Sequence, residues 1–312
     1  MNKLTHAWIF SDNNSRYPDL IAAGSALADQ VNVILIGESN EPVFSYGAHR
    51  IYQLEQADDS TIIENYVASF IEIISKENTP AILLMPPSRS CKVLAAKLSV
   101  HLKAGALNDL GSVKVENGSI YGTHMAYGGL AFSEEKITTS IAIVTLATNV
   151  FEPIPVDTSK TGETVPCAYL APAMTITRTE RRAKEGEQVN LEQARRVVGI
   201  GRGIGAQEDI QMIEQLCQAI GAEMGCSRPI AEGEKWMDKE RYIGVSGVML
   251  KPDIYFAIGI SGQIQHMVGV NGSNTIIAIN KDKNAPVFQF ADYGLVGDLY
   301  KVVPALTHAF KK

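Results

Sequence analysis

Two glycine-rich stretches in the second half of the chain contain residue types suited to binding a phosphate group. The first, residues 254–280, reads IYFAIGISGQIQHMVGVNGSNTIIAIN. An apolar run ends in a Gly-Ile-Ser-Gly turn, and the pattern predicts a helix beginning near Gln263 before a second apolar run at 275–279. The first N–H groups of a helix have no partner within the helix and favour an anion. The same pattern occurs in α/β domains without a ligand, so it does not define a site by itself.

The second stretch is a predicted strand at 196–200 that runs into the glycine-dense loop GRGIG and a predicted helix at 209–220. Gly201, Gly203 and Ala206 match the relaxed dinucleotide fingerprint G-x-G-x-x-A. The acidic residue that binds the ribose about 20 positions further on is missing. The fingerprint of hydride-transferring enzymes is therefore only half met.

Composition excludes several classes of function. With 312 residues, 46% hydrophobic and 20% charged, the chain resembles an ordinary soluble protein of two domains. A net charge of −6 gives no reason to expect binding to nucleic acid or to an anionic membrane. No apolar run approaches the ~18 residues of a membrane span, and the first residues turn polar too early for a secretory signal, so we expect a cytoplasmic protein without membrane insertion. The four cysteines and six histidines lack metal-ligand spacing, and no metal is expected.

The first half of the chain alternates between strand and helix patterns. Strands are predicted at 7–10, 31–36, 51–54 and 81–85, and helices at 19–29, 61–75 and 88–102. This alternation predicts a mostly parallel sheet with helices on both faces. A phosphate could bind at Ser88, at the start of the last of these helices, but we favour an ordinary amphipathic helix with a serine cap. An Asn-Gly pair between alternating segments predicts a hairpin at 117–118, and residues 138–148 predict one more strand.

A domain boundary is predicted where periodicity fades. Residues 151–190 are rich in proline, turn formers and mixed charges, which favours an excursion and a linker. We place the boundary near residue 188, giving domains 1–188 and 189–312. The predicted fold class is α/β, with two domains that each contain a mostly parallel sheet flanked by helices.

Five strings in the second domain together resemble the alpha subunit of electron-transfer flavoproteins. They are GRG at 201–203, CSRP at 226–229, GISGQIQHMVG at 259–269, AINKDKNAP at 278–286 and ADYGLVGD at 291–298. The strings YGGLAF and AAKL in the first domain also fit, so the resemblance covers the whole chain. Within the family, the chain looks most similar to the bacterial FixB-like type, which is associated with anaerobic acyl-CoA and carnitine metabolism. The resemblance implies a nucleotide-hydrolase-like N-terminal domain that contacts a beta subunit, and a Rossmann-like FAD-binding C-terminal domain.

The function implied by the resemblance is that of an electron carrier rather than an enzyme. Each alpha subunit would hold one FAD and shuttle electrons, through semiquinone and hydroquinone states, between an acyl-CoA-type dehydrogenase and a downstream partner such as a quinone or ferredoxin oxidoreductase. A beta subunit would complete the heterodimer and hold AMP or a second FAD. Two alternatives remain open: an enzyme on a related fold, such as an NAD-dependent dehydrogenase or a deacylase, and a nucleotide-binding module without a redox role. The missing ribose-binding acid and the lack of an acid/base pair count against the enzyme.

The resemblance also implies which residues bind FAD. Arg202 would hold the dinucleotide, and Ser227 and Arg228 would lie beside the isoalloxazine. Residues 261–266 would wrap the pyrophosphate and reach the ring through their last two side chains, and residues 280, 298 and 299 would close around the adenosine end. The complete implied set is Arg202, Ser227, Arg228, Ile243, Gly244, Val245, Ser246, Ser261, Gly262, Gln263, Ile264, Gln265, His266, Asn280, Asp298 and Leu299.

Four of these residues are expected to tune the flavin: Arg228, Ser246, Gln265 and His266. One-electron reduction places negative charge on the N1/O2 edge of a flavin, where a donor or a cation is stabilising. A charge-assisted hydrogen bond contributes roughly 1.5 to 3 kcal/mol, on the order of 60 to 130 mV for a one-electron couple. The family commonly has Gly-Gln-Thr-Gly where this chain has Gly-Val-Ser-Gly at 244–247. Ser246 keeps a hydroxyl for the N5 region, whereas Val245 cannot make the side-chain hydrogen bond, so this departure is expected to affect the flavin potential.

Overall fold

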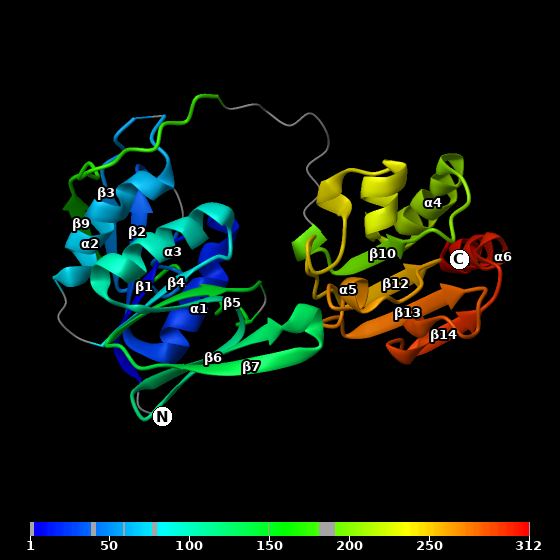
Figure 1. The fold of residues 1–312 in the computed structure, drawn as a ribbon, viewed down its shortest axis with the longest axis horizontal. Coiled ribbons are helices and arrows are strands. Elements are labelled where there is room, and N and C mark those ends of the chain that lie inside the picture. Colours follow the sequence, from blue (N-terminus) through cyan, green and yellow to red (C-terminus); the bar gives the residue numbers. More distant parts are fainter. Residues whose placement is uncertain are drawn as a thin grey trace. The chain divides into compact units, whose positions relative to one another are not determined.

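The computed structural model describes residues 3–38, 42–58, 60–76, 80–148, 150–180 and 191–311. The chain forms two compact units, one of residues 1–126 with 132–183 and the other of residues 127–131 with 184–312. Each unit is built around one β-sheet (Figure 1). The predicted boundary near residue 188 lies outside the described residues.

The sheet of the first unit has nine strands within the described ranges and is mostly parallel. In spatial order they are β7 (Ala131–Ile137), β6 (Ser119–Ala126), β5 (Gly105–Glu116), β8 (Ile141–Leu146), β4 (Ala81–Met85), β1 (Leu4–Ile9), β2 (Ala28–Ile36), β3 (Arg50–Leu54) and β9 (Glu163–Cys167). The strands from β5 to β9 in this order pair in parallel, whereas β5 and β6 form the antiparallel hairpin predicted at 117–118.

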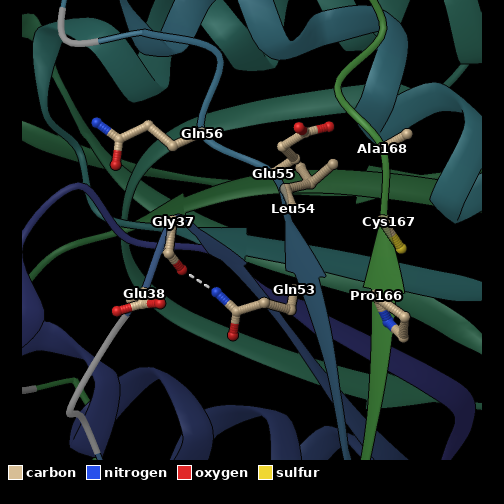
Figure 2. A pocket seen from close by; sticks show the side chains of 9 residues that line it. All are labelled: Gly37, Glu38, Gln53, Leu54, Glu55, Gln56, Pro166, Cys167 and Ala168. Carbon is tan, nitrogen blue, oxygen red and sulfur yellow. Dashed lines mark hydrogen bonds between the residues drawn. The ribbon is translucent and has the colours of Figure 1, made fainter.

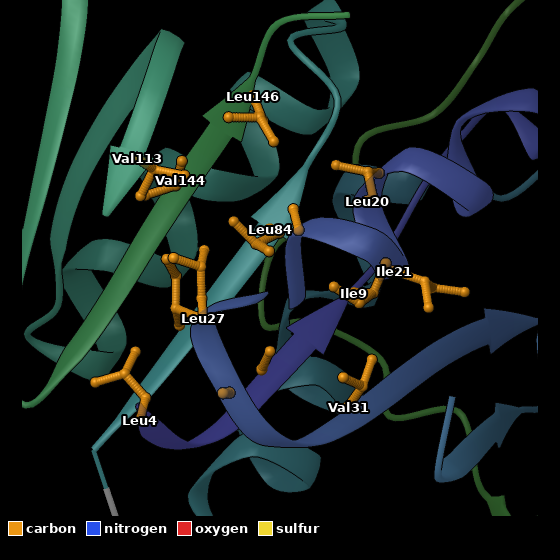
Figure 3. Packing of buried hydrophobic residues seen from close by; sticks show 14 of the residues in the cluster. Leu4, Ile9, Leu20, Ile21, Leu27, Val31, Leu84, Val113, Val144 and Leu146 are labelled. Atoms are coloured by element: carbon orange, nitrogen blue, oxygen red, sulfur yellow. The ribbon is translucent and has the colours of Figure 1, made fainter. Parts of the chain in front are cut away.

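Helices cover both faces of this sheet, as the alternation predicts. Ala7 and Ile9 of β1 pack in the same apolar layer as α1 (Tyr17–Leu27), and Figure 3 shows Ile9 in this layer with Leu20 and Ile21 of that helix. Trp8 packs on the opposite face with α2 (Val67–Ser75) and α3 (Arg89–Leu102). Successive residues of a strand point to opposite faces, so a sheet covered on both sides needs apolar residues at consecutive positions.

Several predicted bounds in this unit differ from the structure. The helix predicted to end at residue 29 ends at Leu27, and the strand predicted at 138–148 begins at Ile141. The linker interpretation of 151–190 missed β9, which pairs with β3 at the sheet edge and contains Pro166. Proline lacks a backbone donor and is tolerated on edge strands, which made this strand resemble a loop. The hydroxyl of Ser88 accepts a hydrogen bond from the Cys91 N–H, so the helix-cap interpretation is correct.

The second unit contains five parallel strands in the order β11 (Glu223–Cys226), β10 (Arg196–Ile200), β12 (Ile254–Ile258), β13 (Thr275–Asn280) and β14 (Tyr293–Val296). The chain crosses from β10 to β11 on one side and then returns to β12 on the other. The loops after β10 and β12 therefore leave the sheet in opposite directions. Ligands of open α/β sheets bind at such a switch point, outside the carboxyl ends of the strands.

The two faces of this second sheet are covered differently (Figure 1). One face packs against α4 (Ile210–Ile220) and α6 (Leu299–Phe310). The opposite face packs against short segments, including the one-turn helix α5 (Ile264–Met267) and the loops that carry Ile243 and Val287. Most of the predicted cofactor residues lie on these short segments, so the apolar packing of this face sets their positions.

Gly262 should be one of the least replaceable residues of the second unit. Its φ is +88°, and an added Cβ would lie 2.1 Å from the backbone nitrogen of Val287. We expect Gly262→Ala to lower the free energy of unfolding by at least about 2 kcal/mol, because both the conformation and the contact are unfavourable for alanine. Urea unfolding followed by tryptophan fluorescence, in which Trp236 reports on this unit and Trp8 on the first, measures this change.

Gly233→Ala is the matched control, because a Cβ at that position meets no atom within 4 Å and the backbone has an ordinary φ. Its unfolding free energy should stay within about 0.5 kcal/mol of the original chain. Equal stability of the two variants would contradict the described packing of the 259–262 turn.

Candidate functional site

The two glycine-rich stretches meet at the switch point of the second sheet. The N–H of Gly201 donates to the carbonyl of Ile258, and the N–H of Gly203 donates to the carbonyl of Gly259, each at 3.0 Å. A Cβ at Gly203 would lie 2.5 Å from the Cα of Gly259, so the two loops can approach only without a side chain there. The two candidate phosphate sites of the sequence are therefore two sides of one site.

Backbone hydrogen bonds connect the remaining loops to this edge. The N–H of Ser227 donates to the carbonyl of Ile200 at 2.8 Å, and the N–H of Ile243 donates to that of Cys226 at 2.9 Å. The N–H of Val245 in turn donates to the carbonyl of Gln265 at 2.9 Å. The structure thus brings the 227–228, 243–246 and 261–266 segments together, although Ile243 lies 16 positions after Ser227 in the chain.

Asn280 and Asp298 are held by the fold at the same edge. The side chain of Asn280 donates to the carbonyl of Ile260 at 2.9 Å and accepts from the N–H of Asp282 at 3.0 Å, so it fixes the 259–262 turn. The carboxylate of Asp298 is exposed and caps α6 by accepting from the N–H of Tyr300 at 3.0 Å. The side chain of Leu299 is buried in the core, which leaves its backbone for contact with a ligand.

The 261–265 turn presents unpaired backbone donors. The N–H groups of these five residues donate no hydrogen bond within the described part of the chain. The helix predicted near Gln263 is only the single turn α5, so its dipole is much smaller than expected. Consecutive free N–H groups are nevertheless an anion-binding arrangement, and this turn can hold a phosphate through them.

Two arginines place positive charge at the rim of the site. Arg202 is exposed and makes no ion pair with the residues that the structure describes. Arg228 is also exposed, and its Nε lies 2.6 Å from a carboxylate oxygen of Glu232. This contact raises the pKa of Arg228 and lowers the pKa of Glu232. A diphosphate is the kind of ligand that such a rim attracts.

His266 is buried and uncharged at neutral pH. Its Nε2 lies 2.8 Å from the hydroxyl of Tyr255, and burial lowers its pKa to about 4, an effect that the backbone of Ile243 partly offsets. Of the two options predicted for tuning, a donor or a cation, the structure supports a neutral ring. Its Nδ1 is buried and has no hydrogen-bond partner among the described residues. A buried polar atom without a partner is expected where a ligand completes the bonding.

Two tyrosines near the site were missed by sequence reasoning. The hydroxyl of Tyr300 donates to Asp209 at 2.6 Å and accepts from the N–H of Gly205 at 2.9 Å, which ties the glycine loop to α6. Asp209 also accepts from the N–H of Ala206, so the N–H groups used in NAD-type fingerprints are occupied internally. Tyr255 was read only as part of an apolar strand. The sequence feature that could have identified Tyr255 is its hydroxyl, which needs a hydrogen-bond partner when a tyrosine lies within a buried apolar run.

A separate hollow of about 730 Å³ lies in the first unit, where β2, β3 and β9 end (Figure 2). It contains none of the predicted cofactor residues. Gln53 donates to the carbonyl of Gly37 across its floor, and Glu38 and Glu55 line it. Two carboxylates make it a poor site for a phosphate-containing ligand.

These observations fit FAD better in the second unit than in the first. Free N–H groups and a cationic rim suit a diphosphate, and a buried unpaired nitrogen suits the polar edge of a flavin. Within the described ranges, no helix is long and apolar enough to cross a bilayer, and no group of three or more potential metal ligands occurs. The fold belongs to the class of α/β proteins with open parallel sheets, in which ligands bind at the switch point, and the second unit has the residues suited to a dinucleotide there.

The chain belongs to the electron-transfer flavoprotein alpha-subunit family. Residues 18–168 match the model described as "Electron transfer flavoprotein domain", and residues 190–271 match the "Electron transfer flavoprotein FAD-binding domain". The proteins FixB of Escherichia coli O7:K1, Shigella dysenteriae serotype 1 and Escherichia coli K12 are each 48% identical over 313 residues, which cover 100% of both chains. The predicted family and fold class are confirmed. Membership supports a role in electron transport, FAD binding and pairing with a beta subunit.

The buried state of His266 predicts a pH dependence of stability. The folded pKa of about 4 lies below the ordinary 6.5, so only the unfolded chain takes up this proton between those values. The resulting stability is fully present above pH 6.5 and is lost as the pH falls to 4. We expect the flavin-free chain to lose about 3 kcal/mol more over this range than its His266→Gln variant.

Urea unfolding at several pH values between 4 and 7.5 checks this expectation. His308 is exposed, so His308→Gln is the matched control and should follow the pH dependence of the original chain. Parallel curves for the original chain and His266→Gln would show that His266 is not buried in its neutral form.

Proposed function

We propose that this chain is the FAD-carrying subunit of a heterodimeric electron-transfer flavoprotein in the cytoplasm. It accepts electrons from an acyl-CoA-type dehydrogenase and passes them to a quinone or ferredoxin oxidoreductase. The beta subunit completes the complex and holds AMP or a second FAD. The single observation that carries the proposal is the convergence of the 201–203, 227–228, 243–246 and 261–266 loops on one sheet edge, within a chain of this family.

FAD, when bound, supplies the redox chemistry, because it takes up and releases electrons singly or in pairs. The protein binds and orients it. The free N–H groups of residues 261–265 hold the diphosphate, and the guanidinium of Arg202 balances its charge. One carboxylate oxygen of Asp298 caps α6, and we assign the other oxygen to the ribose hydroxyls, from which a carboxylate can accept.

The side chains of four residues set the electrostatic environment of the flavin ring. Arg228 supplies the positive charge, and Ser246 and Gln265 supply neutral donors. His266 adds a neutral imidazole. The hydroxyl of Ser246 lies 3.2 Å from that of Tyr242, so this turn has a polar side despite the exposed Val245 beside it.

Co-expression with the beta subunit should give a yellow complex that contains stoichiometric FAD. We expect FAD to bind because the backbone N–H groups of residues 261–265 can hold its diphosphate without the help of a side chain. Absorbance spectroscopy and release of the flavin after denaturation measure the content. A folded heterodimer that remains colourless in the presence of added FAD would contradict the proposed function.

Replacing Arg228 by alanine should make the bound flavin harder to reduce. Removing a cation from the rim weakens stabilisation of the reduced form, and the expected decrease is on the order of 60 to 130 mV for the first electron. A spectroelectrochemical titration measures the potential.

Arg195→Ala removes the same charge at the opposite end of β10, where Arg195 pairs with Asp253 at 2.7 Å. The potential of this control should match that of the original protein. If both variants shifted equally, the effect of Arg228 would be one of net charge rather than of position.

A further inference from the structure

Tyr255 connects the core of the second sheet to the site. Its ring is fully buried near the start of β12, on the face covered by the short segments that carry cofactor residues. A Cβ at Gly199 of the neighbouring strand β10 would lie 1.9 Å from the Tyr255 hydroxyl, so this glycine provides the space for it. The hydroxyl reaches the Nε2 of His266 at 2.8 Å.

The direction of this hydrogen bond follows from the chemistry of the two partners. A buried phenol needs an acceptor for its proton, and His266 is the partner that the described structure offers the Tyr255 hydroxyl. Burial raises the pKa of Tyr255, which therefore keeps its proton, and lowers the pKa of His266 to about 4. A phenol facing a neutral imidazole nitrogen donates to it, so the proton of the ring resides on Nδ1.

Nδ1 of His266 is then a hydrogen-bond donor without an acceptor. It is buried and forms no hydrogen bond with a described residue, although the backbone of Ile243 is close enough to the ring to raise its pKa. An unpaired buried N–H is unfavourable for the free protein, so its retention beside a cofactor site indicates a ligand acceptor. The polar edge of a flavin presents carbonyl oxygens of this kind.

We propose that Tyr255 is a positioning residue of the flavin site, which donates to Nε2 of His266 and fixes the imidazole as the neutral Nδ1–H tautomer. The ring then offers a donor, and not a cation, to a carbonyl of the flavin. The hydrogen bond from His266 to the flavin rests on the proposed function, whereas the tautomer is a property of the chain alone.

The tautomer is measurable in the full-length chain after removal of any cofactor. Nitrogen-15 NMR of labelled histidines distinguishes Nδ1–H from Nε2–H, and the spectrum of His266→Gln identifies the signals of His266. The original chain should show the proton on Nδ1. In Tyr255→Phe the ratio of Nδ1–H to Nε2–H should fall about tenfold, which corresponds to about 1.4 kcal/mol.

Tyr66→Phe is the matched control, because it removes another buried hydroxyl, one that accepts from the N–H of Ala57 in the first unit. It should leave the tautomer of His266 unchanged. A proton on Nε2 in the original chain would overturn the proposal, even if Tyr255→Phe did not fold. An unchanged ratio in a folded Tyr255→Phe would overturn it as well, and would leave Tyr255 a purely structural residue.

The same variants test the role toward the flavin. In the FAD-loaded heterodimer, Tyr255→Phe should lower the flavin potential, whereas Tyr66→Phe should match the original protein. A changed tautomer with an unchanged potential would overturn the role of Tyr255 at the flavin. A complex that binds no flavin would contradict the proposed function itself, and the NMR result on the tautomer would stand.

Discussion

The candidate site depends on the backbone hydrogen bonds that join the loops after β10 and β12. The N–H groups of Gly201 and Gly203 reach the carbonyls of Ile258 and Gly259 only because no Cβ separates the two loops. Since β10 and β12 flank the switch point, this contact brings the two glycine-rich stretches to one place. The arrangement is a property of the main chain, and the side chains around it adjust charge and polarity.

The unequal covering of the second sheet gives this edge its chemistry. Two long helices on one face provide a stable apolar layer, while the opposite face is closed by short segments with many backbone groups outside regular structure. Such segments leave N–H groups free at residues 261–265 and place His266 above the core. The site therefore has positive charge at its rim and a neutral imidazole below it. The charge would attract the dinucleotide, and the imidazole would tune the flavin ring.

The sequence predicted the central elements of this unit well. The strands at 196–200 and 254–258 have their predicted bounds because each is a short run dominated by β-branched and apolar residues that ends directly before a glycine turn. The edge strand β9 was missed, since a proline within five residues resembles a loop. The predicted helix near Gln263 is the single turn Ile264–Met267, and the residues that follow it form a turn.

The site residues were predicted mainly through motifs. The neighbours and the charge states of these residues could not be predicted in this way. Pattern alone could not show that Ser227 lies beside the loop after β10, because the crossover through α4 determines that position. Burial keeps His266 neutral, and the Tyr255 hydroxyl reaches its ring through the space beside Gly199, so these contacts join residues on three separate elements. Pairing between Arg228 and Glu232 is a local helical contact, but its place at the rim of the site is a consequence of topology.

The central claim is that the carboxyl edge of the second sheet holds the dinucleotide, and amide hydrogen exchange tests it most directly. The heterodimer would be compared with and without FAD, by mass spectrometry of peptides from both units. We expect slower exchange in peptides that cover residues 261–265 on FAD binding, since those N–H groups lack acceptors among the described residues. The hollow at the ends of β2, β3 and β9 should be unaffected. Protection at that hollow, with no change at 261–265, would contradict the account.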